Sequence, residues 1–416
     1  MAIQAFYTGI SGIQNSSLGI DVLSNNIANL NTIGFRGYTT EFSSMFEDEI
    51  STGTVSGGSI GSGVKVQTTS MMQDQGVLTL SERSTDLAIL GEGWFGVLGE
   101  GEPIYTRDGA FGFDANSDLV TSDGFYVLGT KGNNISDDNV LINKIDELQL
   151  GDVGAQEKLR FPRTLSYPTV PTAEAKFLGN IGVGFEPVTM STSVVDPQGN
   201  RNQLRLEFIK NPIQVVPGSQ YSVTAMTQTA DAKTIYDTQV GTIEFDEAGA
   251  LSINTLSNIN NNGANIAISL GKGFDGVVSV NLPLSASSSV DGAVGGDLVG
   301  YSINRNAEVM ATFTNGEQSS VGKIAVYHFQ NEQGLDRVNG TRFRTSSNSG
   351  DALFRKDSNG NNINGTKVVN FSLESSNIEL SYGLTELIIL QRSFDANSKS
   401  ITTADEMMQK ALSMGS

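Results

Sequence analysis

Two apolar repeats with a seven-residue spacing stand at opposite ends of this 416-residue chain. Near the start, the repeat is built from Ile3, Phe6, Ile10, Ile13, Ile20 and Ile27. Near the end, it is built from Leu380, Leu384, Leu387, Phe394, Ile401 and Met408. A seven-residue apolar spacing keeps one side of a helix against a partner helix, as in a coiled coil. We therefore predict two long terminal helices that pair with each other around a large insertion.

These helices could be ordinary core helices of a globular domain, but their composition favours association with neighbouring molecules. The C-terminal repeat is interrupted by the polar residues Gln391, Ser398 and Asp405, so one seam buries little apolar surface. The N-terminal helix contains Gly9, Gly12 and Gly19, and each costs about 1 kcal/mol relative to Ala in a helix. We interpret the twelve apolar residues as a polymer interface that neighbouring subunits complete.

The charge of the chain excludes two classes of partner. Its 26 Lys and Arg residues against 45 Asp and Glu residues leave a net charge of −19. This charge repels nucleic acid and anionic lipid surfaces, so we expect neither as a partner. No run reaches the roughly 20 apolar residues of a membrane span, so we expect no membrane insertion.

Few residues suitable for catalysis or metal binding are present. The chain has no Cys and a single His, His328, which removes thiol nucleophiles, zinc thiolates and most metal sites. A hydrolase triad around His328 and an acid pair for glycoside cleavage stay open, as in a secreted carbohydrate-active enzyme or adhesin. We expect no catalytic, cofactor-binding or metal site, and no cofactor.

Two short runs look like ligand-binding motifs but lack essential parts. Residues 91–96 fit a dinucleotide fingerprint, yet a strand-like run and a turn follow where a helix should begin. Residues 114–118 resemble the start of a calcium loop, but Leu119 and Phe125 stand where that loop needs Gly and Glu. We interpret both runs as turns between strands.

The order of elements predicts a nested, mainly β chain. The first helix should run from about residue 3 to residue 29, and the last should begin at a capping box of Ser376 and Glu379. Between them, short apolar runs bounded by Gly, Asp and Asn are typical of strands. The predicted parts are an N-terminal helix of an inner domain (1–35), a connector (36–70), a middle β domain (71–145 and 291–370), an outer inserted β domain (146–290) and a C-terminal inner helix (371–416).

The two ends also carry long, specific motifs. Residues 24–36 read SNNIANLNTIGFR, and residues 391–407 read QRSFDANSKSITTADEM. These runs resemble the terminal signatures of the flagellar rod, hook and hook-associated protein family. The motif residues are Asn25, Asn26, Ala28, Asn29, Asn31, Thr32, Gly34, Phe35, Gln391, Arg392, Ala396, Asn397, Ser398 and Lys399.

Within that family, residues 195–199 and 300–335 are similar to the hook type, although a distal rod subunit stays the alternative. The resemblance implies a subunit of a flexible helical tube, the universal joint of the flagellum, with the terminal helices lining the tube. It implies contacts with copies of itself, rod proteins, hook-filament junction proteins and the hook cap. It also implies location in the hook, outside the cell, after export by the flagellar type III apparatus without a cleaved signal peptide.

Overall fold

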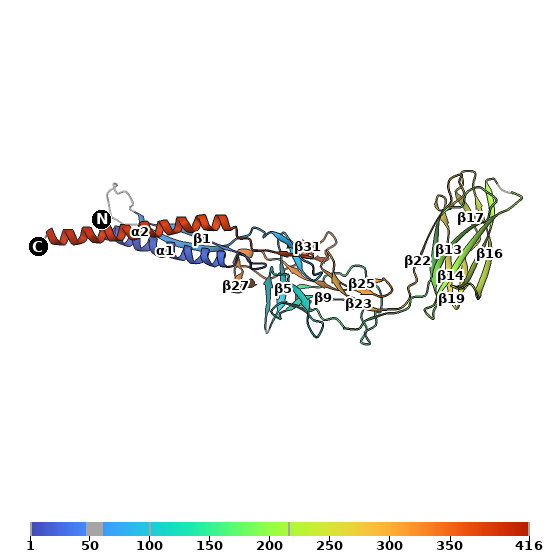
Figure 1. Ribbon diagram of the computed structural model, residues 1–416, viewed down its shortest axis with the longest axis horizontal. Helices are drawn as coiled ribbons and strands as arrows, with labels where there is room; N and C mark the ends of the chain where they lie inside the picture. Colours follow the sequence, from blue (N-terminus) through green and yellow to red (C-terminus); the bar gives the residue numbers. More distant parts are fainter. Residues whose placement is uncertain (1, 47–60, 100, 215–216, 415–416) are drawn as a thin grey trace.

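The computed structural model describes residues 2–46, 61–99, 101–214 and 217–414. The molecule is elongated and has three parts in a row (Figure 1). Helices α1 (Ala2–Ala28) and α2 (Leu380–Met414) lie side by side at one end, which also holds both termini. A middle β unit follows, and an outer β unit formed by the centre of the sequence lies at the far end. The predicted class, mainly β with two terminal helices, is confirmed.

The first helix begins and ends within a residue of its predicted limits, but the capping box is wrong. The helix α2 begins at Leu380, because Glu379 is the residue whose carbonyl accepts the Gly383 N–H (2.9 Å). Ser376 Oγ accepts the N–H of Ile378 instead (3.4 Å). The preceding residues are held extended in strand β32 (Ser372–Glu374), which pairs with β3 (Leu78–Leu80), so the helix cannot begin earlier.

A β-hairpin leads from α1 towards the middle unit. Strands β1 (Tyr38–Phe46) and β2 (Gly61–Met71) pair antiparallel, and Asn15 Nδ2 of α1 donates to the Val64 carbonyl (2.7 Å). The predicted connector is therefore a hairpin that packs along the first helix. Residues 47–60 of the predicted connector lie outside the described residues.

The middle unit is built on one 13-stranded sheet that draws on both halves of the chain. Its strands are β5 (Trp94–Leu98), β6 (Pro103–Thr106), β7 (Phe111–Phe113), β8 (Leu119–Thr121), β9 (Tyr126–Lys131), β10 (Glu157–Lys158), β11 (Ser166–Tyr167), β23 (Gly296–Ile303), β24 (Glu308–Phe313), β25 (Gln318–Ile324), β26 (Val326–Tyr327), β27 (Asp336–Asn339) and β28 (Arg342–Arg344). Two smaller pairs join β4 (Leu87–Leu90) to β31 (Lys367–Asn370) and β29 (Arg355–Lys356) to β30 (Asn362–Ile363).

The predicted start of the outer domain at residue 146 is too early. Strands β10 and β11 pair with β9 and β23, and Leu159, Phe161 and Leu165 are buried in the core of the middle unit. The outer unit begins only at β12 and ends with β22 at Val290, at the predicted limit. Pro162 lies in chain that still belongs to the middle unit, whereas Pro168 and Pro171 lie between β11 and β12, in the link to the outer unit.

The outer unit consists of two sheets around a shared apolar core. Alternate side chains of β14 are buried, as expected for a strand with one face on a core. Phe177, Phe208, Tyr221 and Phe245 fill the space between the sheets. The strands are β12 (Glu174–Asn180), β13 (Val188–Val195), β14 (Arg201–Lys210), β15 (Ser219–Thr229), β16 (Ile235–Phe245), β17 (Leu251–Asn254), β18 (Asn258–Asn261), β19 (Ala264–Ser269), β20 (Gly271–Lys272), β21 (Asp275–Val278) and β22 (Ser285–Val290).

The run that resembled a calcium loop is a turn between β7 and β8, as predicted. Asp114 Oδ1 accepts the N–H groups of Asn116 (2.7 Å) and Asp118 (2.9 Å), which uses the carboxylate within its own turn. Among the described residues, no group of three or more His, Asp or Glu side chains is placed to hold a metal ion. No helix in the same part of the chain is long and apolar enough to cross a membrane.

His328 lies in the middle unit, 4% exposed. Its Nε2 is 2.6 Å from the Asn364 carbonyl and therefore carries the hydrogen, while Nδ1 is buried with no hydrogen-bond partner in the described structure. A triad needs a carboxylate on that second nitrogen, so the geometry is that of a packed strand residue. Burial lowers the pKa of His328 from its usual value of 6.5.

This lowered pKa predicts acid sensitivity of the middle unit. Below about pH 6.5 the unfolded chain binds a proton at His328 that the folded chain does not. The free energy of unfolding therefore decreases as the pH is lowered. Urea unfolding, followed by fluorescence of Trp94, the single tryptophan, should show this loss between about pH 7.5 and pH 5.5. His328→Gln should show a smaller loss, and equal losses in the two proteins would contradict the prediction.

Candidate assembly interface

The two terminal helices approach each other most closely through glycines of α1. A Cβ added to Gly9 would lie 2.7 Å from Cγ1 of Ile401, and one added to Gly12 would lie 2.6 Å from Cγ of Asn397. Side chains of α2 therefore rest directly on the backbone of α1. The buried residues of α1 recur every three or four positions, at Gly9, Gly12, Ser16, Gly19, Leu23 and Asn26.

The predicted interface residues of α1 flank this glycine seam. Phe6, Ile10, Ile13, Ile20 and Ile27 are all half-buried, and only the place of Ile3 within α1 is described. On α2, Leu387, Phe394, Ile401 and Met408 are half-buried, and their spacing puts them on the side that carries Asn397. Leu380 and Leu384 are 44% and 45% exposed. These contacts show that the helices pack; supercoiling and contacts with neighbouring subunits stay predictions.

A large part of the apolar surface of the helix pair faces outward. Ile388, Ile389, Tyr382 and Met407 of α2 are each at least half exposed, and Tyr7 of α1 is exposed too. Apolar side chains exposed along a helix pair are candidates for an interaction surface. The isolated helix pair is therefore an incomplete hydrophobic unit.

The N-terminal motif forms a junction between the helices and the middle unit. Asn26 is buried at the end of α1, where its side chain donates to the Tyr38 carbonyl (2.7 Å) and accepts the Tyr38 N–H (3.1 Å). Thr32 Oγ1 donates to Asn29 Oδ1 (3.1 Å) in the turn that follows. These bonds turn the chain from the helix into β1, which explains the polar residues that the motif contains.

Gly34 allows the chain to pass against the middle unit. Its φ is +66°, a left-handed conformation that glycine adopts readily, and its N–H donates to the Glu374 carbonyl (2.7 Å). A Cβ at this position would lie 2.4 Å from the Asp108 backbone nitrogen. The motif therefore needs glycine here both for conformation and for space.

Arg36, which ends the motif, belongs to a buried group of three charges. Arg36 Nη2 lies 2.9 Å from Glu374 Oε1, and Arg107 Nη1 lies 3.3 Å from Glu374 Oε2. The side chains of Arg36 and Glu374 are only 3% and 2% exposed. Arg36 also donates to the carbonyls of Gln73 and Asp74, and the Gly76 N–H donates to Glu374 Oε1 (3.1 Å). One carboxylate thus joins the start, the end and the middle of the chain.

Arg107 is the member of this group whose positive charge is made less favourable by burial. Burial lowers its pKa to about 10, assisted by the positive charge of Arg36 and opposed by Glu374. Its guanidinium lies 5.4 Å from the Trp94 ring centroid, and its Nε has no hydrogen-bond partner in the described structure. Because Glu374 serves two cations, removing it would leave both buried and unpaired.

Asn377, three residues after the end of β32, adds a second link at the same place. Its Oδ1 accepts the Gly37 N–H (2.9 Å), and its Nδ2 donates to the carbonyls of Met72 (3.2 Å) and Asp74 (2.9 Å). Sequence reasoning missed Asn377, Glu374 and Arg107. Nothing in the sequence shows which acid would pair with Arg107.

The C-terminal motif lies on α2 and differs from the junction in its exposure. Asn397 packs on Gly12, whereas most of the motif faces outward. The exposed members are Gln391, Arg392, Ala396, Ser398 and Lys399. In the N-terminal motif, Asn25 and Ala28 are exposed as well, while Phe35 is buried.

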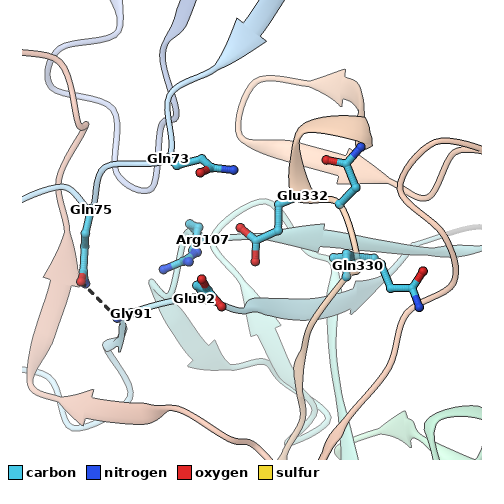
Figure 2. A pocket seen from close by; sticks show the side chains of 9 residues that line it. Gln73, Gln75, Gly91, Glu92, Arg107, Gln330 and Glu332 are labelled. Carbon is cyan, nitrogen blue, oxygen red and sulfur yellow. Dashed lines mark hydrogen bonds between the residues drawn. The ribbon is translucent and has the colours of Figure 1, made fainter.

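A pocket of about 340 Å³ opens beside the junction (Figure 2). Arg107, Glu92 and Glu332 point into it, and the Gly91 N–H donates to Gln75 Oε1 (3.1 Å). Arg107 is paired with Glu374, and Glu92 is paired with Arg355 (2.6 Å). The dinucleotide-like run 91–96 leads into strand β5 here, so no helix N-terminus is presented to a phosphate.

Glu374→Gln should destabilise the junction strongly. It leaves two buried guanidinium groups without a counter-charge, for which we expect a loss of about 3–5 kcal/mol in the free energy of unfolding. Glu92→Gln is the control, because that pair is exposed and is worth less than about 1 kcal/mol. Urea unfolding monitored by Trp94 fluorescence measures both, and similar losses would contradict the assignment.

Gly34→Ala should lower the free energy of unfolding by more than the strain of a positive φ alone would. We expect a loss above about 2 kcal/mol, because strain in φ adds to a clash with the Asp108 backbone. Gly124→Ala is the matched control, since Gly124 also has positive φ (+88°) but no atom lies within 4 Å of its added Cβ. Thermal unfolding of the two variants should separate the clash from the strain; equal shifts would show that space at Gly34 is unimportant.

Three protein-family models match the chain. The model described as "Flagella basal body rod protein" matches residues 6–36, and "Flagellar hook protein FlgE/F/G D1 domain" matches residues 88–155. The model described as "Flagellar basal body rod FlgEFG protein C-terminal" matches residues 370–414. The terminal matches cover the motif, the junction and α2, and the central match covers the first part of the middle unit.

Curated relatives match over nearly the whole length. Flagellar hook protein FlgE of Borreliella burgdorferi is 28% identical over 98% of both chains. Flagellar hook protein FlgE of Salmonella typhimurium is 27% identical over 99% of this chain and 100% of its own. In fold, the chain is similar to the crystal structure of Helicobacter pylori flagellar hook protein FlgE2 (TM-score 0.56, 14% identity, 71% of this chain and all of that one). Over nearly its whole length, the chain is therefore similar to proteins of the flagellar rod and hook family.

Proposed function

We propose that this chain is the structural subunit of the bacterial flagellar hook, which polymerises into a flexible helical tube and transmits torque from rod to filament. The observation that carries this proposal is the full-length match to hook proteins, including the outer β unit from Glu174 to Val290. The linear arrangement supports it, because paired helices at one end and β units beyond them suit an inner wall and an outer shell (Figure 1).

The helix pair is the proposed polymer contact. Its exposed apolar residues, such as Ile389 (60% exposed), would be buried by the helices of neighbouring subunits. The half-buried isoleucines beside the glycine seam would complete that contact. In this proposal the exposed residues of the C-terminal motif meet adjacent copies of the chain.

The remaining partners follow from the proposed place in the flagellum. Rod proteins, hook-filament junction proteins and the hook cap would contact the ends of the tube. The flagellar type III apparatus would export the chain unfolded and without cleavage of a signal peptide. The lack of Cys suits this route, since refolding outside the cell would need no disulfide.

A distal rod subunit is the second candidate, because the family models at both termini carry the names of rod proteins. The two functions differ in the polymer they require. A hook subunit forms curved, bendable tubes, whereas a rod subunit forms straight, rigid ones. Cryo-imaging of tubes assembled from the purified chain decides between them, and monomeric turnover of a glycan would contradict both.

Aspartate substitutions on α2 should separate folding from assembly. Leu387→Asp places a charge against α1, and Ile389→Asp places one on the exposed side, so both should abolish tube formation. Ile213→Asp in the outer unit, at a position 78% exposed, is the control and should still assemble. Sedimentation and electron microscopy measure assembly, and unchanged Trp94 fluorescence shows that the middle unit is folded.

Normal tubes from Ile389→Asp would remove the exposed side of α2 from the proposed interface. Normal tubes from Leu387→Asp would exclude the helix pair as the main polymer contact. Because Leu387 is also half-buried within the subunit, the two variants together distinguish a lost contact between subunits from a lost contact within one.

A further inference from the structure

The chain contains five Asn-Gly pairs, which begin at Asn262, Asn315, Asn339, Asn359 and Asn364. We propose that Asn339 is a site of spontaneous deamidation, and that the fold protects the other four. The proposal goes beyond hook function and does not depend on it. It rests on the hydrogen bonds that each pair makes or lacks.

The reaction needs a free asparagine side chain and a free N–H on the next residue. The Gly nitrogen attacks the Asn Cγ, a C–N bond forms, and Nδ2 leaves as ammonia with the proton from the Gly N–H. Water then adds to one of the two carbonyls of the cyclic imide and opens the ring. The products are aspartate, or isoaspartate when the main chain continues through Cβ.

Three pairs have a side chain that is already held. Asn262 Nδ2 donates to Asp196 Oδ2 (2.8 Å) and Gln198 Oε1 (3.0 Å), and the Gly263 N–H is used as well. Asn315 Nδ2 donates to the Val294 carbonyl (2.6 Å). Asn364 is buried, with its Oδ1 accepting the Val326 N–H (3.1 Å) and its Nδ2 donating to Ile324 (3.1 Å). Ring closure at any of these must first break such bonds.

The fourth pair is protected at the nucleophile. The Gly360 N–H donates to the Asp357 carbonyl (3.1 Å) within the turn that starts at Asp357. The Asp357 carboxylate also accepts the N–H groups of Asn359 and Asn361, both at 2.8 Å. The turn therefore fixes the backbone on both sides of Asn359 although the side chain itself makes no hydrogen bond in the described structure.

Asn339 lacks both kinds of protection. It is exposed at the end of β27, next to the two-residue turn that joins β27 to β28. Its carboxamide makes no hydrogen bond in the described structure, and the same holds for the Gly340 N–H. Gly340 has a positive φ of +51°, so the turn has the backbone freedom of glycine.

Deamidation would place a negative charge near two arginine side chains of the same hairpin. Asn339 is opposite Arg342 across the hairpin, and Arg342 is paired with Asp123. Arg337 Nε donates to the Gly340 carbonyl (2.8 Å), and its guanidinium lies 4.8 Å from the ring centroid of Phe35, a junction residue. The modification would thus act on a hairpin that contacts the junction.

The test follows the five pairs in one sample of the full-length chain. The folded protein is kept at mildly alkaline pH and physiological temperature, then digested, and each Asn-Gly peptide is quantified by mass spectrometry for replacement of NH by oxygen. Asn339 should convert about tenfold faster than the others, the factor expected when one or two hydrogen bonds oppose ring closure elsewhere. In concentrated urea the five rates should converge.

Asn339→Gln supplies the matched variant, since its longer side chain would have to close a six-membered ring. It should lose conversion at this position and leave the other four rates unchanged. Faster conversion at any other pair in the folded chain would overturn the proposal. A rank order that is the same in urea would overturn it too, because the fold would then play no part.

Discussion

The structure depends on one buried carboxylate that neutralises two buried guanidinium groups. Glu374 lies before α2, Arg36 after α1, and Arg107 directly after strand β6 of the middle sheet, so the three residues join segments far apart in the sequence. Removing charges from water costs several kcal/mol per ion, and the pairing repays that cost only with accurate geometry. The arrangement therefore specifies how the helix pair is attached to the β units more than it adds stability.

The second constraint is the close approach of the helices through glycine. In isolation, Gly9, Gly12 and Gly19 weaken α1, and the sequence alone favoured a helix that needs a partner to be ordered. The structure adds the reason for glycine at these positions, since Ile401, Asn397 and Leu390 occupy the space where side chains would project. The propensity cost is offset by backbone contact with α2.

Much of this fold can be predicted from local pattern, and the errors have one physical cause. The limits of α1, the strand in β14 and the turn at Asp114 follow from spacing and turn chemistry. The capping box at Ser376 and the domain boundary at 146 failed because strand pairing with distant partners, β3 and β9, decided the conformation. The junction was also beyond local reasoning, since Glu374 and Arg107 are 267 residues apart.

The glycine seam also explains why the helix pair leaves apolar surface open. Because α2 packs on backbone, the branched side chains of α1 lie beside the contact and not within it, and they stay half-buried at Ile10, Ile13 and Ile20. Packing of this kind gives a close contact but leaves these side chains partly exposed, where the proposed association would bury them. A single subunit can hold its helices together through the junction, while neighbouring copies would supply the remaining hydrophobic stabilisation. In the proposed polymer the glycines would thus separate two tasks, positioning the helices within a subunit and leaving apolar side chains available to neighbouring copies.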